Sequence, residues 1–355
     1  MDNKKFGATI IVFIVIAFIV NSFYIEPSIS IARGQGTVLS PNWWEGLNWI
    51  KENTDECAVV ATYWDPGHFI TGIARRPVVF DGASQSELYK RTIPNTDFSE
   101  NELSEGLHII PYDSGINHII LVEGDKKTTA RIQDISTTLL TGNETLAVNI
   151  LKEFRQPGCN EMYYIASADL IGKSVWWSYF ATWNPETKGS QYSYALSYLS
   201  KATPLPAQNS VVYTYPLDAQ TSFVVFDTNS TLTAKLQQQN QFLDIEHFFY
   251  FNEVGQGKLL TNTEAPVKGT AWLAGDRQTL VFMPPELESS LFTRMFFYNG
   301  QGLERFQYVN NWGGELKLYK VIFDDIEEEP PQESIITEDL IGDDEITTLE
   351  DMLEE

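Results

Sequence analysis

The sequence predicts a mixed α/β core with a following, mainly β region, behind one N-terminal transmembrane helix. Residues 6–24 form an apolar run without charge. Between residues 40 and 203, short apolar runs typical of strands alternate with amphipathic patterns of helical period. From about Pro204 the runs become short, β-branched and aromatic, and turn residues interrupt them often. We therefore divide the chain into a cytoplasmic N-terminus (1–5), a transmembrane anchor (6–24), a linker (25–39), an α/β core (40–203), a β-rich region with a closing hairpin (204–323) and an acidic disordered tail (324–355).

Phe6–Tyr24, FGATIIVFIVIAFIVNSFY, is long enough to span a bilayer. The alternative is a cleavable signal peptide, but the run is long for one and no A-x-A-like site follows, which favours an uncleaved anchor. Lys4 and Lys5 precede the run, so the positive-inside rule places them in the cytoplasm and the body of the chain outside. Sequons at Asn143 and Asn229 are possible glycosylation sites and fit an extracytoplasmic body.

The elements of the core follow from local signals. Ser40-Pro41 begins the first helix, because serine suits the N-cap and proline the first helical position. An apolar run from Ala58 is typical of a strand covered on both faces, and it ends in aromatics and a Pro-Gly turn. We then expect a short helix (68–76), a strand (77–80), a helix after the capping box 84–87, strands at 108–110 and 118–122, helices at 128–140 and 144–154, a strand at 163–167 and a helix from Asp169.

The negative charge of the chain is concentrated in its tail. The formal net charge is −24, and residues 324–355 contain 15 carboxylates and no Lys or Arg, which leaves −9 for the other 323 residues. A chain with this negative charge offers no electrostatic attraction to the phosphate backbone, so we expect no nucleic-acid partner. A solvated, disordered segment is the main interpretation of the tail, and a short helix that docks on a partner is the alternative.

Carboxylates follow two of the expected strands. Asp65 follows the strand that begins at Ala58, and Asp169 follows the strand 163–167. If both strands lie in one parallel sheet, the carboxylates share the edge where ligands bind in open α/β sheets. Taken singly, Asp65 is explained as a turn former and Asp169 as a helix N-cap. With four His, two separated Cys and no metal-type spacing, we expect no metal site.

The same region carries a family resemblance. Tyr63-Trp64-Asp65-Pro66-Gly67 resembles the WWDxG signature of oligosaccharyltransferase catalytic subunits of the archaeal type, with Tyr63 in place of the first tryptophan and Pro66 at the variable position. The flanks agree, because Trp43–Ile50, Glu52–Thr54 and Arg76–Gly82 resemble the segments around that signature. The resemblance to the C-terminal soluble domain of the family extends well from Trp43 to about Lys173, loosely over 289–320 and hardly over 204–285.

A second signature of the family, a strand-to-helix junction with an Asp and a Lys, resembles Asp169 and Lys173. Three residues separate this pair here, whereas two do in the family pattern. The resemblance implies acceptor-peptide-binding residues and no catalytic residue: Tyr63, Trp64, Asp65, Asp169 and Lys173. In the family the WWD residues hydrogen-bond the hydroxyl of the sequon Ser or Thr. An ionised Asp is an acceptor matched to a hydroxyl donor, and the Tyr63 phenol would replace the missing indole N–H.

The resemblance also implies partners. In the family, the metal-binding carboxylates (for Mg²⁺ or Mn²⁺) and the lipid-linked sugar site lie in a many-helix membrane domain. We therefore expect no cofactor in this chain, and we expect a polytopic membrane catalytic domain or subunit, the membrane and acceptor polypeptides with Asn-x-Ser/Thr as its partners. The predicted function is the extracytoplasmic sequon-recognition part of an oligosaccharyltransferase in N-glycosylation, inactive alone. Whether the chain is a fragment, a split-gene product or a stand-alone module stays open.

Two other classes of protein remain as alternatives. One is an extracytoplasmic hydrolase that uses Asp65, Asp81 and Asp169 as acid and base. The other is a non-enzymatic, membrane-anchored surface protein. Cys57 and Cys159 each lie just before an expected strand, so an oxidising exterior would favour a disulfide, with two buried free thiols as the alternative.

Overall fold

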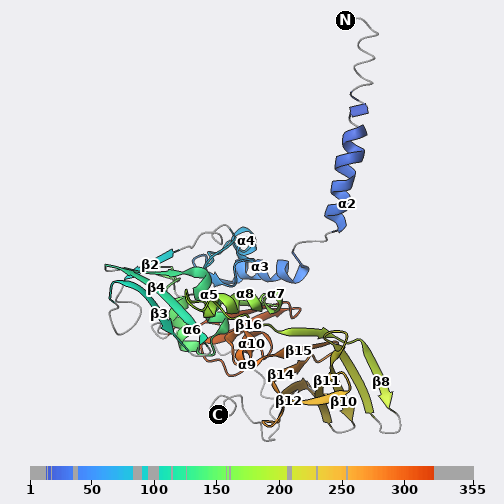
Figure 1. The fold of residues 1–355 in the computed structure, drawn as a ribbon. Coiled ribbons are helices and arrows are strands. Elements are labelled where there is room, and N and C mark those ends of the chain that lie inside the picture. Colours follow the sequence, from blue (N-terminus) through green and yellow to red (C-terminus); the bar gives the residue numbers. More distant parts are fainter. Residues whose placement is uncertain are drawn as a thin grey trace, which may run out of the picture. The chain divides into compact units, whose positions relative to one another are not determined.

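The computed structural model describes residues 13, 15, 16, 18–34, 39–82, 90–94, 104–112, 115–124, 126–156, 158, 159, 161–205, 210–228, 231–252 and 255–323. The chain divides into two compact units, residues 1–45 and 46–355. Figure 1 shows the order of the helices and strands along the chain.

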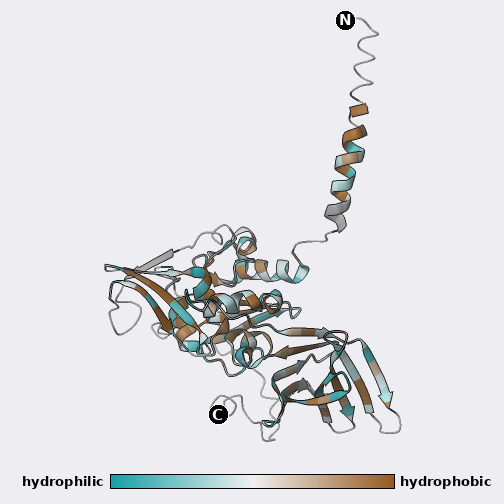
Figure 2. Ribbon diagram, viewed as in Figure 1, coloured by the Kyte–Doolittle hydropathy of each residue, from teal (hydrophilic) through white to brown (hydrophobic). Residues whose placement is uncertain are grey.

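The first unit is helical where it is described. It contains a π-helix η1 (Asn21–Ile25), α2 (Glu26–Gly34) and the start of α3 (Pro41–Asn53), whose expected N-cap Ser40 accepts a hydrogen bond from Trp43 N at 3.2 Å. Figure 2 shows hydrophobic residues along the helical segment that ends at Gly34. The side chains of Phe13, Phe18 and Phe23 are exposed. Of the helices that can be described, none combines the length and apolar character that crossing a membrane requires. Residues 1–12, 14 and 17 are not described, so the anchor over 6–24 stays a prediction.

A mixed four-stranded sheet is the centre of the second unit. Its order is β1 (Val59–Ala61), β6 (Met162–Ser167), β17 (Leu316–Val321) and β16 (Phe306–Trp312). β1 and β6 are parallel, with Val60 opposite Tyr163, whereas β17 is antiparallel to both β6 and β16. The closing hairpin expected near residue 310 therefore joins the central sheet. The parallel pairing places the carboxyl ends of β1 and β6 at one edge.

Helices cover both faces of this sheet. One face packs on α5 (Arg131–Leu140), α6 (Glu144–Lys152), α8 (Ser174–Thr182) and α10 (Leu291–Phe296), in a core that includes Ala61, Tyr164, Trp177 and Phe292. On the other face lies the part of α3 that belongs to this unit, from Gly46 onward, and an added Cβ at Gly46 would come 2.7 Å from Leu316. Because both faces are covered, β6 is buried at every position.

A second sheet lies beside α5, and it corrects one expected boundary. Its order is β2 (Lys90–Pro94), β5 (Lys126–Ala130), β4 (Asn117–Glu123) and β3 (Gly106–Pro111). Thr128, expected to begin a helix, lies in β5 opposite Leu121 of β4, and the helix begins only at Arg131. The strand expected over 77–80 is reduced to one parallel bridge, Val60 to Val78. The helix expected from 84–87 lies outside the described residues.

The β-rich part begins at residue 195 and forms one sheet around its own core. Its strands are β7 (Ala195–Tyr198), β8 (Lys201–Leu205), β9 (Ser210–Pro216), β10 (Thr221–Thr228), β11 (Thr231–Gln238), β12 (Gln241–Phe251), β13 (Gly257–Thr261), β14 (Val267–Leu273) and β15 (Thr279–Met283). The spatial order is β7-β15-β14-β12-β11-β10-β9-β8, and β13 pairs with β12. Tyr215, Phe223 and Phe248 are among the buried side chains of this core. The expected combination of a mixed α/β core and a following β-rich region is confirmed.

Candidate functional site

The structure brings together three of the residues singled out in the sequence. Asp65 lies in the turn after β1, Asp169 begins α7 (Asp169–Gly172) directly after β6, and Lys173 lies at the junction of α7 and α8. The ammonium group of Lys173 is 2.6 Å from Asp169 Oδ2 and is also in direct contact with Asp65 Oδ2. We call these three residues the strand-edge cluster.

The strand-edge cluster is polar and accessible from solvent. The side chains of Asp65, Asp169 and Lys173 are 25%, 36% and 30% exposed. Burial alone would lower the pKa of Lys173, but the hydrogen bonds and charges of Asp169 and Asp65 outweigh burial and raise that pKa above its ordinary value. Two carboxylates share one ammonium, so the cluster retains one formal negative charge. Since a carboxylate has about four lone-pair sites, the ammonium contact leaves acceptor capacity for an incoming donor.

The turn that carries Asp65 depends on a close approach of the chain. Gly67 N donates to Trp64 O at 3.1 Å, and the short helix α4 (Gly67–Phe69) follows. A Cβ at Gly67 would lie 2.6 Å from the Asp81 Cβ and 2.8 Å from the Phe80 carbonyl oxygen. Glycine is therefore required at this position of the signature, and the reason is packing of the turn against the segment 77–81.

Tyr63 and Trp64 differ in accessibility. Tyr63 is 2% exposed and packs edge-on against Phe80, with ring centroids 6.2 Å apart. Burial, and then the charge of Asp65, raise the pKa of its phenol well above the usual range. The structure thus places Tyr63 in the core, where it packs against Phe80 and supports the turn. Trp64 is partly buried and packs against the same core.

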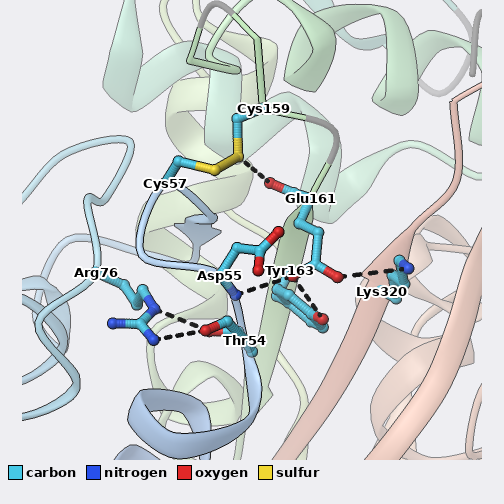
Figure 3. Close-up of a disulfide and its surroundings, with 8 residues drawn as sticks. All are labelled: Thr54, Asp55, Cys57, Arg76, Cys159, Glu161, Tyr163 and Lys320. Atoms are coloured by element: carbon cyan, nitrogen blue, oxygen red, sulfur yellow. Dashed lines mark hydrogen bonds and ion pairs between the residues drawn. A yellow bond between two sulfur atoms is a disulfide. The ribbon is translucent and has the colours of Figure 1, made fainter.

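A disulfide ties the two site-bearing strands together at their other ends. Cys57 and Cys159 are bonded, with Cα atoms 5.9 Å apart, just before β1 and β6 (Figure 3). Beside it, Glu161 Oε2 accepts hydrogen bonds from Asp55 N at 3.1 Å and from the Tyr163 hydroxyl at 3.2 Å. These bonds fix the start of β1 against the start of β6, and hence the spacing of Asp65 and Asp169.

A buried arginine completes this scaffold. Arg76 is 5% exposed, and its guanidinium donates to the carbonyl oxygens of Lys51 and Thr54 at 2.8 and 2.6 Å, at the end of α3. A cation at the last carbonyls of a helix satisfies groups that otherwise lack partners. The sequence contained Arg76 within the Arg76–Gly82 flank, but no local pattern indicated that it would reach back to α3.

Two observations on the described residues concern a metal site and the hydrolase alternative. Within these residues, no group of three or more His, Cys, Asp or Glu is arranged to hold a metal ion. Asp81, the third carboxylate of the hydrolase alternative, lies 3.7 Å from His68 Nδ1.

Taken together, the fold and the strand-edge cluster define a mixed α/β domain with a polar, acidic edge. Comparisons with known proteins identify its relatives. A "Dolichyl-phosphooligosaccharide-protein glycotransferase" of Methanocaldococcus jannaschii is 26% identical over 324 residues, which cover 75% of this chain and 32% of the relative. A protein of the same name from Methanococcus voltae is 24% identical over 314 residues, covering 74% of this chain and 34% of the relative. No protein-family model matches the chain.

Among solved structures, the crystal structure of the C. jejuni pglb C-terminal domain matches with a TM-score of 0.44 and 12% identity, covering 79% of this chain and 99% of that one. The expected resemblance to archaeal oligosaccharyltransferases is confirmed by the two archaeal relatives, and their names agree with the expectation that the chain is part of such an enzyme. The chain spans about a third of the length of these relatives. The hydrolase and the surface protein are not favoured.

Proposed function

We propose that this chain is the acceptor-recognition part of an oligosaccharyltransferase, and that its strand-edge cluster binds the hydroxyl of an Asn-x-Ser/Thr sequon. The observation that carries the proposal is the meeting of Asp65, Asp169 and Lys173 at the carboxyl ends of β1 and β6. The two relatives are named dolichyl-phosphooligosaccharide-protein glycotransferases. A transfer to protein requires a site that binds the acceptor polypeptide, and we assign that role to the cluster.

The chemistry of the cluster suits a small hydroxyl donor. A carboxylate accepts hydrogen bonds, so Asp65, held beside the Lys173 ammonium, matches a Ser or Thr O–H donor. Lys173 keeps both carboxylates in place, because it contacts one oxygen of each. Trp64, partly buried next to Asp65, would limit the room around the hydroxyl. We assign the contact with the hydroxyl to Asp65, the positioning of Asp65 to Lys173 and Asp169, and packing to Trp64.

Binding of matched peptides tests this function. We expect the full chain to bind an Asn-x-Thr peptide about tenfold or more tightly than the same peptide with Val, which has the shape of Thr without its hydroxyl. The reason is that a hydrogen bond to a charged group contributes roughly 1.5–3 kcal/mol. Titration calorimetry of both peptides measures the preference, and equal affinities in the wild type would refute sequon recognition.

A variant series connects the preference to the cluster. Asp65→Asn keeps the size and turn propensity but removes the charge, so the Thr-over-Val preference should shrink while the fold survives. Asp169→Asn should have a weaker effect, because Asp169 acts through Lys173. Asp218→Asn is the matched control: Asp218 also forms a turn, accepting from Gln220 N at 2.7 Å in the β-rich part. If Asp218→Asn reduced the Thr-over-Val preference as much as Asp65→Asn does, the preference would not depend on the strand-edge cluster.

We further propose that the body lies outside the cytoplasm, with the N-terminus inside, and that the chemistry of transfer comes from a polytopic membrane domain or subunit. The disulfide supports an oxidising, extracytoplasmic location, because such bonds rarely persist in the cytosol. The matched region covers only about a third of each relative, so we assign the chemistry of transfer, with the Mg²⁺ or Mn²⁺ site that the family resemblance implies, to a membrane domain or subunit. Affinity purification of the membrane-bound chain from its own cells should recover a polytopic glycosyltransferase, and its absence would count against this assignment.

A further inference from the structure

One of the two sequons of this chain lies on a described and well-anchored turn. Asn143, Glu144 and Thr145 lie where α6 begins, and the side chains of Asn143 and Thr145 are exposed. Glu144 points the other way: its carboxylate is 3.2 Å from Arg294 Nη2 and accepts hydrogen bonds from Glu304 N at 3.0 Å and Arg305 N at 2.8 Å. The middle residue thus fixes the sequon to the core while its two specificity residues face solvent.

The hydrogen bonding of Asn143 leaves the reactive atom open. Asn143 is the N-cap of α6, and its Oδ1 accepts a hydrogen bond from Leu146 N at 3.0 Å. N-glycosylation modifies Nδ2 and leaves Oδ1 an acceptor, so a glycan would not compete with the cap. In the described part of the chain no hydrogen bond involves Nδ2 of Asn143.

The turn is held from its inner side. Leu291 N donates to Thr141 O at 2.8 Å, and Arg294 Nη1 donates to Gly142 O at 3.3 Å. An added Cβ at Gly142 would come 2.9 Å from Ser289 O, so there is no room for a further side chain on that side. The open side of the turn is the one that presents Asn143, and a glycan there would project from a fixed point.

We propose that Asn143 is an N-glycosylation site of this chain. The donor is a lipid-linked oligosaccharide phosphate: the bond from the anomeric carbon to the phosphate oxygen breaks, the phosphate leaves with the electron pair, the anomeric carbon bonds to Nδ2, and Nδ2 loses a proton to a base. The proposal rests on the proposed function in one respect, the extracytoplasmic location of the body. Asn-x-Thr exposed on a secreted or extracellular surface is the acceptor pattern for this modification.

Peptide mass spectrometry tests the site. The full chain is expressed in an archaeal host that glycosylates proteins, and trypsin then releases residues 132–152, which contain Asn143 as their only sequon. We expect this peptide to carry the mass of the host glycan. An unmodified 132–152 peptide, from cells in which a reporter sequon is glycosylated, would overturn the proposal. The other sequon, Asn229, lies on the separate peptide 202–235, so the two are read independently.

Three variants separate modification from folding. Asn143→Asp keeps an oxygen for the N-cap and removes the amide, so the fold should survive without the glycan. Thr145→Val removes the hydroxyl with the shape unchanged and should abolish the modification as well, whereas Thr145→Ser should retain it. Glycan on Thr145→Val at the wild-type level would contradict a sequon-dependent reaction. The host enzyme transfers the glycan in this experiment. These peptide masses therefore do not depend on whether Asp65 binds sequon hydroxyls, and the two proposals can fail independently.

Discussion

Lys173 neutralises one of two neighbouring carboxylates, and its replacement tests whether the strand-edge cluster is an energetic unit. We expect Lys173→Met to lower the free energy of unfolding by about 1 kcal/mol, because Asp65 and Asp169 then face each other without a cation and all three groups are partly exposed. Asp169→Asn should lower the free energy of unfolding less in the Lys173→Met background than in the wild type. Urea unfolding of the two single variants and the double variant measures this coupling. If the changes in the free energy of unfolding are strictly additive, Asp169 and Lys173 act independently and the cluster is not an energetic unit.

Glu288 is expected to make the stability of the fold depend on pH. Burial first, and then the charges of Glu246 and Glu286, raise the pKa of this carboxyl from 4.5 to about 7, although a hydrogen bond from Thr270 opposes the shift. The folded state therefore binds a proton more tightly than the unfolded one, and this stabilising contribution is complete below pH 4.5 and lost as the pH rises through about 7. We expect Glu288→Gln to be more stable than the wild type at pH 8, by on the order of 2 kcal/mol, and equal to it near pH 4.5.

Thermal unfolding at the two pH values gives the measurement for Glu288, with Glu286→Gln as the matched control. Glu286 is exposed on the same short helix, α9 (Pro285–Glu288), so its replacement should change stability little at either pH. A Glu288→Gln variant that is equally stable relative to the wild type at pH 4.5 and pH 8 would show that the carboxyl titrates normally.

The candidate site was accessible to sequence reasoning where it depends on strand ends. Asp65 and Asp169 follow apolar runs, and the parallel pairing of β1 and β6 brings the ends of those runs to one edge. Lys173 was found through its place in a signature, but its contact with both carboxylates depends on the α7–α8 junction, which no local pattern specifies. The burial of Tyr63 could not be read from the sequence, because an aromatic residue at a strand end suits either face.

At the scale of elements, the turn after β1 is the most constrained segment of the site. We expect Gly67→Ala to lower the free energy of unfolding by about 2 kcal/mol or more, because the new methyl group would meet Asp81 and the Phe80 carbonyl at less than 3.0 Å. Gly72→Ala, in the π-helix η2 (Ile70–Ala74) with no atom within 4 Å of the added Cβ, is the control and should be neutral or slightly stabilising. Chemical denaturation compares the two, and equal effects would show that the approach at Gly67 is relaxed in solution.

Elements were predicted well where a local signal marks their ends. Ser40 caps α3 and Asn143 caps α6 with side-chain hydrogen bonds. The start of α5 was placed too early because its N-cap, Ala130, offers no side-chain oxygen, so only pairing with β4 decides where β5 stops. The position of the closing hairpin in the central sheet could not be read locally either, since β17 pairs with β6 at a sequence separation of about 150 residues.

At the scale of the whole molecule, one covalent bond closes a loop of about 100 residues. Cys57 and Cys159 are 102 residues apart, and the chain-entropy model gives about 4–5 kcal/mol for a loop of this length. We expect the double variant Cys57→Ser/Cys159→Ser to fold but to be less stable by about 2–4 kcal/mol, because the bonds of Glu161 still join the two strand starts. Urea unfolding measures the loss. Reaction of both thiols with maleimide in unreduced, denatured wild type would contradict the disulfide itself.

The last prediction concerns activity. The purified chain, supplied with lipid-linked oligosaccharide and an Asn-x-Thr peptide, should bind the peptide and transfer no glycan, because it spans only about a third of its glycotransferase relatives. Addition of a polytopic partner purified from the same cells should produce the glycopeptide, and Asp65→Asn should then slow transfer to Asn-x-Thr more than it weakens association of the partner with the chain. Mass spectrometry of the peptide measures transfer, and co-purification measures association.

Two outcomes would contradict this prediction. Turnover by the chain alone would show that the chemistry resides in it. Full transfer with Asp65→Asn would show that the hydroxyl is recognised elsewhere, and the strand-edge cluster would then be a structural ion pair at the end of two strands.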